Sequence, residues 1–248
     1  MDQHGQHRPL VRVAALAMLL AAGSAADAAC RQALALGLDV SGSVDAAEYR
    51  LQLDGLAAAL TDPEVASALL DDAAAPVRIA VYEWSGPEFQ SLVLDWTALG
   101  SEAELLAAAS ALRRHQRSAG ADLTTALGTA LVTGFDLLAS QGDCWKRTLD
   151  ISGDGKSNAG PRPQDVADQR ANDIVVNALV IGTGTSGADG QNVEGDLKEL
   201  TPYFEAYVIA GDGAFAEAAL GFDDYGAAMK RKLLRELQSI VIGWNSVD

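Results

Sequence analysis

Short apolar segments alternate with longer amphipathic stretches along almost the whole chain. The clearest short segments, 33–38 and 174–181, are nearly continuous in apolar residues, which is typical of strands buried on both faces. The longer stretches carry apolar residues at helical spacing. We predict strands at 33–38, 77–84, 89–96, 146–152, 174–181 and 204–210, and helices from the capping-box sequence 45–48 to Leu60 and at 101–114, 125–139, 163–171 and 222–244.

This order of elements indicates an α/β domain with a doubly wound, mostly parallel sheet of six strands and helices on both faces. The exception to parallel pairing is the pair 77–84 and 89–96, which flank the four residues Ser85-Gly86-Pro87-Glu88. Two strands separated by such a short turn predict a hairpin. We therefore expect one antiparallel edge strand.

The first 28 residues have the features of an export signal. Arg8 and Arg12 precede an apolar run at 13–22, and Ala26-Asp27-Ala28 gives a small-x-small cleavage pattern. The run is shorter than the roughly 20 residues that a membrane-spanning helix needs. We expect a signal peptide at 1–28, one domain at 29–248, no transmembrane segment, and a periplasmic or secreted location.

The formal net charge of −16 limits the classes of partner. A strongly acidic surface repels phosphate backbones, so we expect no nucleic-acid partner. Cations and cationic surfaces remain compatible with this charge. The charge is also compatible with a role in keeping the protein soluble and nothing more.

Oxygen-bearing side chains follow two of the predicted strands and precede one helix. Asp39, Ser41 and Ser43 alternate after the first strand and therefore point to one side. Thr124 and Thr125 stand immediately ahead of a helix, and Asp154 lies between glycines after the strand 146–152. Such an oxygen set suits Mg²⁺ or Mn²⁺. Taken alone, Asp-x-Ser-x-Ser also occurs in ordinary loops that cap a helix.

Together these residues resemble the metal-ion-dependent adhesion site of von Willebrand factor type A domains. The resemblance rests on Asp39-Val40-Ser41-Gly42-Ser43, on the Thr-x-x-Gly-x-Ala-Leu context of Thr125-Ala126-Leu127-Gly128-Thr129-Ala130-Leu131, and on Asp154-Gly155. The stretches "LDVSGSVDAAEY", "LDISGDGKSN" and "YVIAGDGAFA" are similar to an exported bacterial branch of such proteins, known only as a domain of unknown function. The resemblance covers roughly residues 33–242.

The resemblance implies a site and a function. Asp39, Ser41, Ser43 and Thr125 would contact Mg²⁺ or Mn²⁺ directly or through water, and Asp154 would hold it through water. A protein partner would present an Asp or Glu carboxylate to the cation. The family usually has glycines before the threonine, whereas this chain has Asp122-Leu123-Thr124, so Thr124 competes with Thr125 for the role. The strand order implied is 3-2-1-4-5-6.

Four other functions remain as alternatives. A phosphotransferase of the haloacid dehalogenase type needs Asp-x-Asp, but the second position here is Ser41. A Ser-His-Asp hydrolase needs a positioned histidine, and His115 lies in a basic helix end with Arg113, Arg114 and Arg117, which we interpret as solvated surface. We therefore expect no enzymatic activity.

A third protein class, a structural module, would use the metal for folding alone.

A nucleotide-binding role rests on one glycine-rich segment. Gly182-Thr183-Gly184-Thr185-Ser186-Gly187 matches G-x-G-x-x-G. In dinucleotide-binding domains this motif follows the first strand and opens a helix. Here it follows the fifth strand, and Ala188-Asp189-Gly190 stands where the helix should begin. We interpret it as a loop.

The two cysteines of the domain, Cys30 and Cys144, are predicted to form a disulfide. Each precedes one of the site aspartates, Asp39 and Asp154, by about one strand length. If the aspartates meet at the carboxyl ends of adjacent parallel strands, the cysteines lie near the opposite ends, within the roughly 4.4–6.8 Å Cα separation that a disulfide accepts. Two independent thiols are the alternative.

Overall fold

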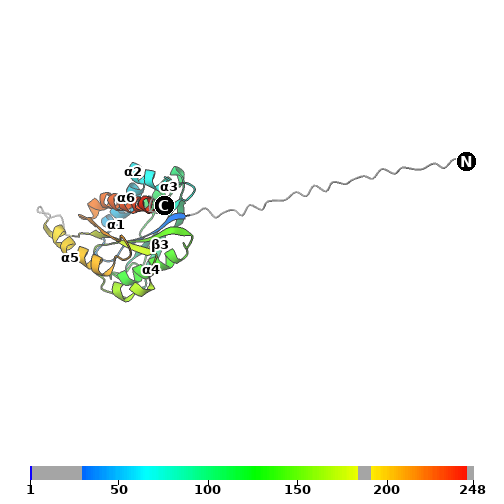
Figure 1. The fold of residues 1–248 in the computed structure, drawn as a ribbon. Coiled ribbons are helices and arrows are strands. Elements are labelled where there is room, and N and C mark those ends of the chain that lie inside the picture. Colours follow the sequence, from blue (N-terminus) through cyan, green and yellow to red (C-terminus); the bar gives the residue numbers. More distant parts are fainter. Residues whose placement is uncertain (2–29, 184–190, 245–248) are drawn as a thin grey trace.

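The computed structural model describes residues 1, 30–183 and 191–244. Its strands form one twisted sheet in the order β3-β2-β1-β4-β5-β6 (Figure 1). All neighbouring strands are parallel except β2 and β3, which form the predicted antiparallel hairpin at one edge. This confirms the predicted fold class and strand order. The strands are β1 Cys30–Asp39, β2 Val77–Trp84, β3 Gln90–Leu99, β4 Cys144–Gly153, β5 Ile174–Ile181 and β6 Ala216–Ala219.

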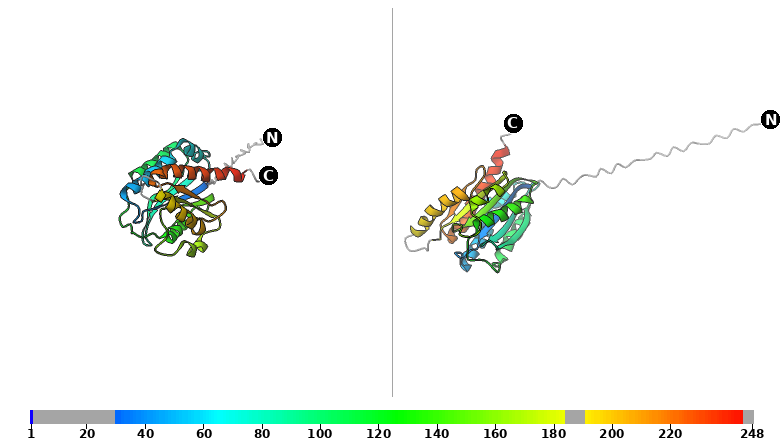
Figure 2. Two further views of the ribbon diagram at one scale, coloured as in Figure 1. Left: turned by 90° about the vertical axis from the view of Figure 1, so that its left-hand side faces the viewer. Right: turned by 90° about the horizontal axis from the view of Figure 1, so that it is seen from below.

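Helices cover both faces of the sheet, as Figures 1 and 2 show. One layer contains α1, α2, α3 and α6, and the other contains α4 and α5. No helix in the described part of the chain combines the length and the apolar content needed to cross a bilayer. The helices are α1 Ala46–Leu60, α2 Pro63–Leu69, α3 Glu102–Arg114, α4 Leu127–Ala139, α5 Gln191–Tyr207 and α6 Tyr225–Trp244.

The central strand β1 supplies side chains to two apolar cores, one on each face. Leu34, Leu36 and Leu38 pack with α1, α3 and α6. Ala33 and Ala35 pack on the other face with α4 and α5. Every residue of β1 is buried, which explains the nearly continuous apolar run at 33–38 within it.

Asp45 starts α1 directly after the first strand-end loop. Its side chain accepts hydrogen bonds from the backbone N–H groups of Ala47 and Glu48, at 2.7 and 2.9 Å. The Glu48 carboxylate in turn accepts from the Asp45 N–H at 2.8 Å. This confirms the predicted capping box, which fixes the point at which the loop must end.

Two predicted elements are wrong. The segment 204–210 was expected to be the sixth strand, but Phe204 belongs to α5 and the sixth strand is β6. The aromatic residues favoured a strand, yet apolar residues recur here at helical spacing and pack against the sheet: Leu197, Leu200, Phe204 and Val208. The sequence of β6, Ala-Glu-Ala-Ala, lacks the β-branched residues that mark a strand.

The predicted helix at 163–171 consists of two short 3₁₀ turns, η1 Pro163–Asp165 and η2 Ala167–Gln169. Pro163 and Val166 are its buried side chains. Two buried positions do not form a stripe long enough to stabilise an α-helix. The predicted signal peptide, apart from its first residue, lies outside the described residues, and so does 184–187 of the glycine-rich segment.

Cys30 and Cys144 form the predicted disulfide. They are register partners at the amino ends of the parallel strands β1 and β4. The bridge closes a loop with a sequence separation of 114 residues, so it constrains the unfolded chain strongly.

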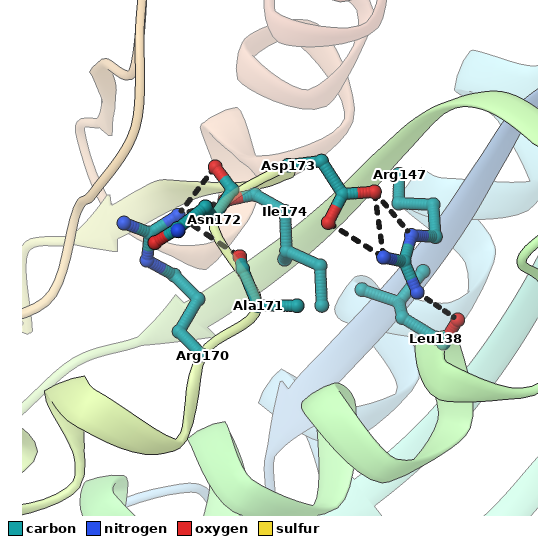
Figure 3. A network of polar contacts seen from close by, with 7 residues as sticks. All are labelled: Leu138, Arg147, Arg170, Ala171, Asn172, Asp173 and Ile174. Atoms are coloured by element: carbon teal, nitrogen blue, oxygen red, sulfur yellow. Dashed lines mark hydrogen bonds and ion pairs between the residues drawn. The ribbon is translucent and has the colours of Figure 1, made fainter.

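Polar contacts fix the connection that enters β5 at the same end of the sheet (Figure 3). The Arg147 guanidinium of β4 pairs with Asp173 at 2.6 Å and donates to the Leu138 carbonyl at 3.1 Å. Arg170 donates to the carbonyl oxygen of Ile174, the first residue of β5. The end of α4 and the start of β5 are thus tied to β4.

A buried ionic network joins α6 to the sheet. Lys232 is fully buried and forms ion pairs with Asp150 of β4 and Glu236 of α6. Asn177 of β5 donates to Glu236 at 2.5 Å and accepts from the backbone N–H of Phe215 at 3.0 Å. Lys232 therefore places a positive charge beside two carboxylates whose burial in an apolar interior would otherwise be costly.

Replacing Lys232 should destabilise the fold far more than replacing its neighbour Lys230. In Lys232→Met, Asp150 and Glu236 stay buried without this cation, so the free energy of unfolding should fall by about 3–5 kcal/mol. Lys230 forms surface ion pairs with Asp62 and Glu64, so Lys230→Met should have a much smaller effect. Urea unfolding of the oxidised proteins measures both; equal losses would contradict the structural role of the network.

Candidate metal centre

Three loops meet at the carboxyl ends of β1 and β4. The first follows β1 from Asp39 to Val44, the second precedes α4 at 122–126, and the third begins at Asp154 after β4. Because β1 and β4 are parallel neighbours, the first and third loops leave the same edge of the sheet side by side. Such an edge is the usual ligand site in open α/β sheets.

The hydroxyl groups of the first two loops form a connected row that reaches the carboxylate of the third loop. Ser41 Oγ lies 3.3 Å from Ser43 Oγ, and Thr125 Oγ1 donates to Ser41 Oγ at 3.4 Å. Ser43 Oγ donates to Asp154 Oδ1 at 2.8 Å. The Ser41 N–H donates to Asp39 Oδ1 at 2.7 Å. The structure therefore brings together all five side chains that the sequence singled out.

The two carboxylates of this group are buried and only half satisfied. Asp39 is 0% exposed and Asp154 is 5% exposed. Oδ2 of Asp39 and Oδ2 of Asp154 accept no hydrogen bond within the described part of the chain. Buried polar atoms of this kind normally have a partner, so these two call for one.

Electrostatics at the site disfavour two negative charges. Burial, and next the negative charge of Asp154, raise the pKa of Asp39 to about 7, against the hydrogen bonds from Ser41. Burial also raises the pKa of Asp154, against the lowering effect of the Ser43 hydroxyl. A cation between the carboxylates would remove both the desolvation penalty and the repulsion.

The donor set fits a hard cation. It consists of two carboxylates and three hydroxyls, without nitrogen or sulfur, which is the chemistry that Mg²⁺ and Mn²⁺ prefer. Among the described residues, no group of three or more His, Cys, Asp and Glu side chains could hold a metal ion. The site thus differs from carboxylate-rich calcium sites and from zinc sites built on Cys and His.

Two residues outside the predicted set hold the second loop in place. Asn158 Oδ1 accepts from the Thr125 N–H at 2.8 Å. Ser85, in the hairpin turn, accepts from Asp122 N–H through its hydroxyl at 2.9 Å and from Ala126 N–H through its carbonyl at 2.8 Å. Ser85 follows β2 and was expected only as part of a hairpin turn. No sequence signal therefore linked it to the site.

The geometry distinguishes the two candidate threonines. The Thr125 hydroxyl faces Ser41, whereas the Thr124 backbone N–H donates to Asp122 Oδ1 at 3.0 Å and its buried hydroxyl has no hydrogen-bond partner in the described residues. Thr125 is therefore the threonine that lies in the row of hydroxyls.

The interpretation of the basic helix end as solvated surface holds for Arg113 and Arg114, which are exposed, but it is wrong for His115 and Arg117. His115 Nε2 lies 3.2 Å from Glu83 Oε1, which is fully buried. Arg117 donates to backbone carbonyl oxygens of the first loop, including Val44 O at 2.9 Å. Their partners are far away in sequence, so the local basic pattern gave no sign of these contacts.

Comparison with known proteins gives a family match and a fold match. The family model described as "Protein of unknown function (DUF1194)" matches residues 29–241. Curated proteins give no match.

Solved structures share the fold at low identity. Proximal thread matrix protein 1 from the mussel byssus, with a zinc-occupied MIDAS motif, aligns with a TM-score of 0.52 and 15% identity over 85% of this chain and 47% of that chain. The pilus adhesin SpaC from Lactobacillus rhamnosus GG has a TM-score of 0.54 and 13% identity over 86% and 31%. A von Willebrand factor type A protein from Catenulispora acidiphila has 0.51 and 14% over 85% and 43%.

These similarities establish a von Willebrand factor type A fold. This chain spans less than half the length of each of these three chains. One of them is described as a pilus adhesin and another as a thread matrix protein with a zinc-occupied MIDAS motif.

The close approach of the first two loops depends on Gly42. Its N–H donates to Leu123 O at 3.2 Å, and a Cβ there would lie 2.9 Å from Leu123 O and 3.0 Å from Leu123 Cα. Gly42→Ala should push the loops apart and lower the free energy of unfolding by about 1–3 kcal/mol. Gly155→Ala is the matched control, because a Cβ there meets nothing within 4 Å. Urea unfolding measures both, and a Gly42→Ala protein as stable as the control would contradict the tight contact.

Proposed function

This chain belongs to the family described as "Protein of unknown function (DUF1194)", and we propose that it is an exported protein-binding domain that depends on a divalent cation. The cation would lie at the carboxyl ends of β1 and β4. The partner would be a protein that presents an Asp or Glu carboxylate. The domain would act by binding and not as an enzyme.

One observation carries the proposal: two buried carboxylate oxygens without a hydrogen-bond donor lie beside a row of three hydroxyls. Asp39, Ser41, Ser43 and Thr125 would hold the cation directly or through water, and Asp154 would hold it through water. Because every donor is oxygen, Mg²⁺ or Mn²⁺ should bind in preference to Zn²⁺.

The small number of carboxylates supports a binding role for the site. With only Asp39 and Asp154 nearby, a bound Mg²⁺ or Mn²⁺ would keep positive charge and an open position for an acidic side chain of the partner. The adhesion-type neighbours on the same fold, one of which carries zinc in its MIDAS motif, support the same role.

A Ser-His-Asp hydrolase needs a histidine beside its serine, and within the described residues no histidine stands beside the serines of this site. His115, the one histidine within the described residues, lies beside Glu83 and forms no hydrogen bond with Ser41 or Ser43. A serine nucleophile needs a base within hydrogen-bond reach.

Export is supported by the signal-like first 28 residues, and the Cys30–Cys144 disulfide is typical of an oxidising compartment such as the periplasm.

Asp39→Ala should abolish most of the Mg²⁺ affinity. The loss should exceed the roughly 10–100-fold that removal of an outer-shell partner causes, because one of only two carboxylates is gone. Asp71→Ala is the control, since Asp71 is 73% exposed and lies beside Arg31 at the opposite end of β1. Isothermal titration with MgCl₂ measures both, and an unchanged affinity in Asp39→Ala would refute the site.

The two threonines can be separated by isosteric replacement. Thr125→Val removes the hydroxyl that faces Ser41, so Mg²⁺ should bind about 10-fold more weakly or worse. Thr124→Val should leave the affinity nearly unchanged. The same titration decides between them, and a larger effect of Thr124→Val would assign the role to Thr124.

Partner binding needs its own test. Wild-type protein and Asp39→Ala, each immobilised, are incubated with periplasmic extract in MgCl₂ or in EDTA. A partner of the proposed kind should be retained only by the wild-type protein and only with Mg²⁺. If Mg²⁺ binds but no protein shows this dependence, the metal serves folding alone.

A further inference from the structure

Arg117 grips the first loop of the candidate metal centre from the side of its backbone carbonyls. Its guanidinium donates to Val40 O, to Ser41 O at 3.3 Å and to Val44 O at 2.9 Å. These three carbonyls bracket Ser41 and Ser43. One side chain, contributed by the connection between α3 and α4, thereby fixes both ends of the loop.

The chain segment that carries Arg117 is held by a buried carboxylate. The N–H of Ser118, the next residue, donates to Glu83 Oε2 at 3.1 Å. Glu83 is fully buried in β2 and also accepts from the Tyr49 hydroxyl at 2.5 Å. The Arg117 guanidinium carbon lies 5.9 Å from the centre of the Tyr49 ring. The segment that carries Arg117 is therefore attached to two rigid elements, β2 and α1.

The loop needs such support because its side chains crowd oxygen atoms together. Asp39, Ser41, Ser43 and Asp154 bring carboxylate and hydroxyl oxygens close together, and without a cation the two carboxylates, when both are charged, repel each other. A guanidinium presents several donors in a fixed planar fork, whereas an ammonium group is a single point charge. Several carbonyls held by one fork keep the loop in the shape that a cation requires.

We propose that Arg117 is a positioning residue that preorganises the loop Asp39–Val44 for cation binding through its fork of hydrogen bonds. The cation part of this inference rests on the proposed function. The claim that Arg117 holds the loop in place does not rest on the proposed function, because it concerns only contacts between described residues.

The test compares Arg117→Gln, Arg117→Lys and the control Arg113→Gln. Arg113 is exposed and lies in the last turn of the same helix, α3. Isothermal titration with MgCl₂ should show an affinity lowered about 10–100-fold in Arg117→Gln, as for outer-shell partners of metal sites. Arg117→Lys should be weakened to a similar degree, because it keeps the charge but loses the fork. Arg113→Gln should match the wild-type protein.

Hydrogen exchange of the metal-free proteins gives a second readout that does not need the cation. Amides at 40–44 should exchange faster in both Arg117 variants than in the wild-type protein, while those of β4 and β5 should be unchanged. Urea unfolding measures global stability in parallel. A merely structural role would lower stability and leave Mg²⁺ affinity of the folded protein unchanged.

Each outcome bears on a distinct claim. Wild-type protein that binds no Mg²⁺ refutes the proposed function, and hydrogen exchange then decides whether Arg117 holds the loop. If the wild-type protein binds Mg²⁺ and Arg117→Gln binds it within about twofold of that affinity, the positioning role is wrong. If Arg117→Lys binds Mg²⁺ as tightly as the wild-type protein, the claim that the guanidinium fork is needed is wrong. If Arg117→Gln does not fold, Arg117→Lys carries the test.

Discussion

The parallel pairing of β1 with β4 determines what lies at both ends of the sheet. At the amino ends it sets Cys30 opposite Cys144, where they form a disulfide. At the carboxyl ends it brings Asp39 and Asp154 into one group with the hydroxyls between them. The covalent bridge therefore locks the register on which the candidate metal centre depends, since a slip of one residue would turn its side chains to the other face.

Local patterns were enough to predict most of the fold. The buried runs of β1, β2, β4 and β5 and the capping box at Asp45 depend on residues close in sequence, and the structure confirms them. The strand β6 was missed because four residues rich in alanine carry no strand signal, and Phe204 was misassigned because its aromatic neighbourhood obscured a helical period. In both places tertiary packing decided the outcome.

The candidate site shows the same division between local and distant information. Asp39, Ser41, Ser43, Thr125 and Asp154 could be selected because each follows a strand or precedes a helix. The contacts that shape their loops could not. Ser85 and Asn158 hold the second loop from other loops, and Arg117 reaches Val44 across 73 residues. Sequence spacing predicts where side chains start, but long-range hydrogen bonds determine how a loop is held.

Buried carboxylates inside the sheet and buried carboxylates at its carboxyl edge have different partners, and the difference bears on function. Asp150 of β4 is 2% exposed and is paired with Lys232, a lysine that α6 brings into the interior. Asp39 and Asp154 are equally enclosed, yet within the described residues no Lys or Arg side chain forms an ion pair with either of them. At Asp150 the protein thus supplies its own cation. Where it supplies none, and instead surrounds the carboxylates with hydroxyls at the open edge of the sheet, a cation from solution is the physical counterpart of Lys232.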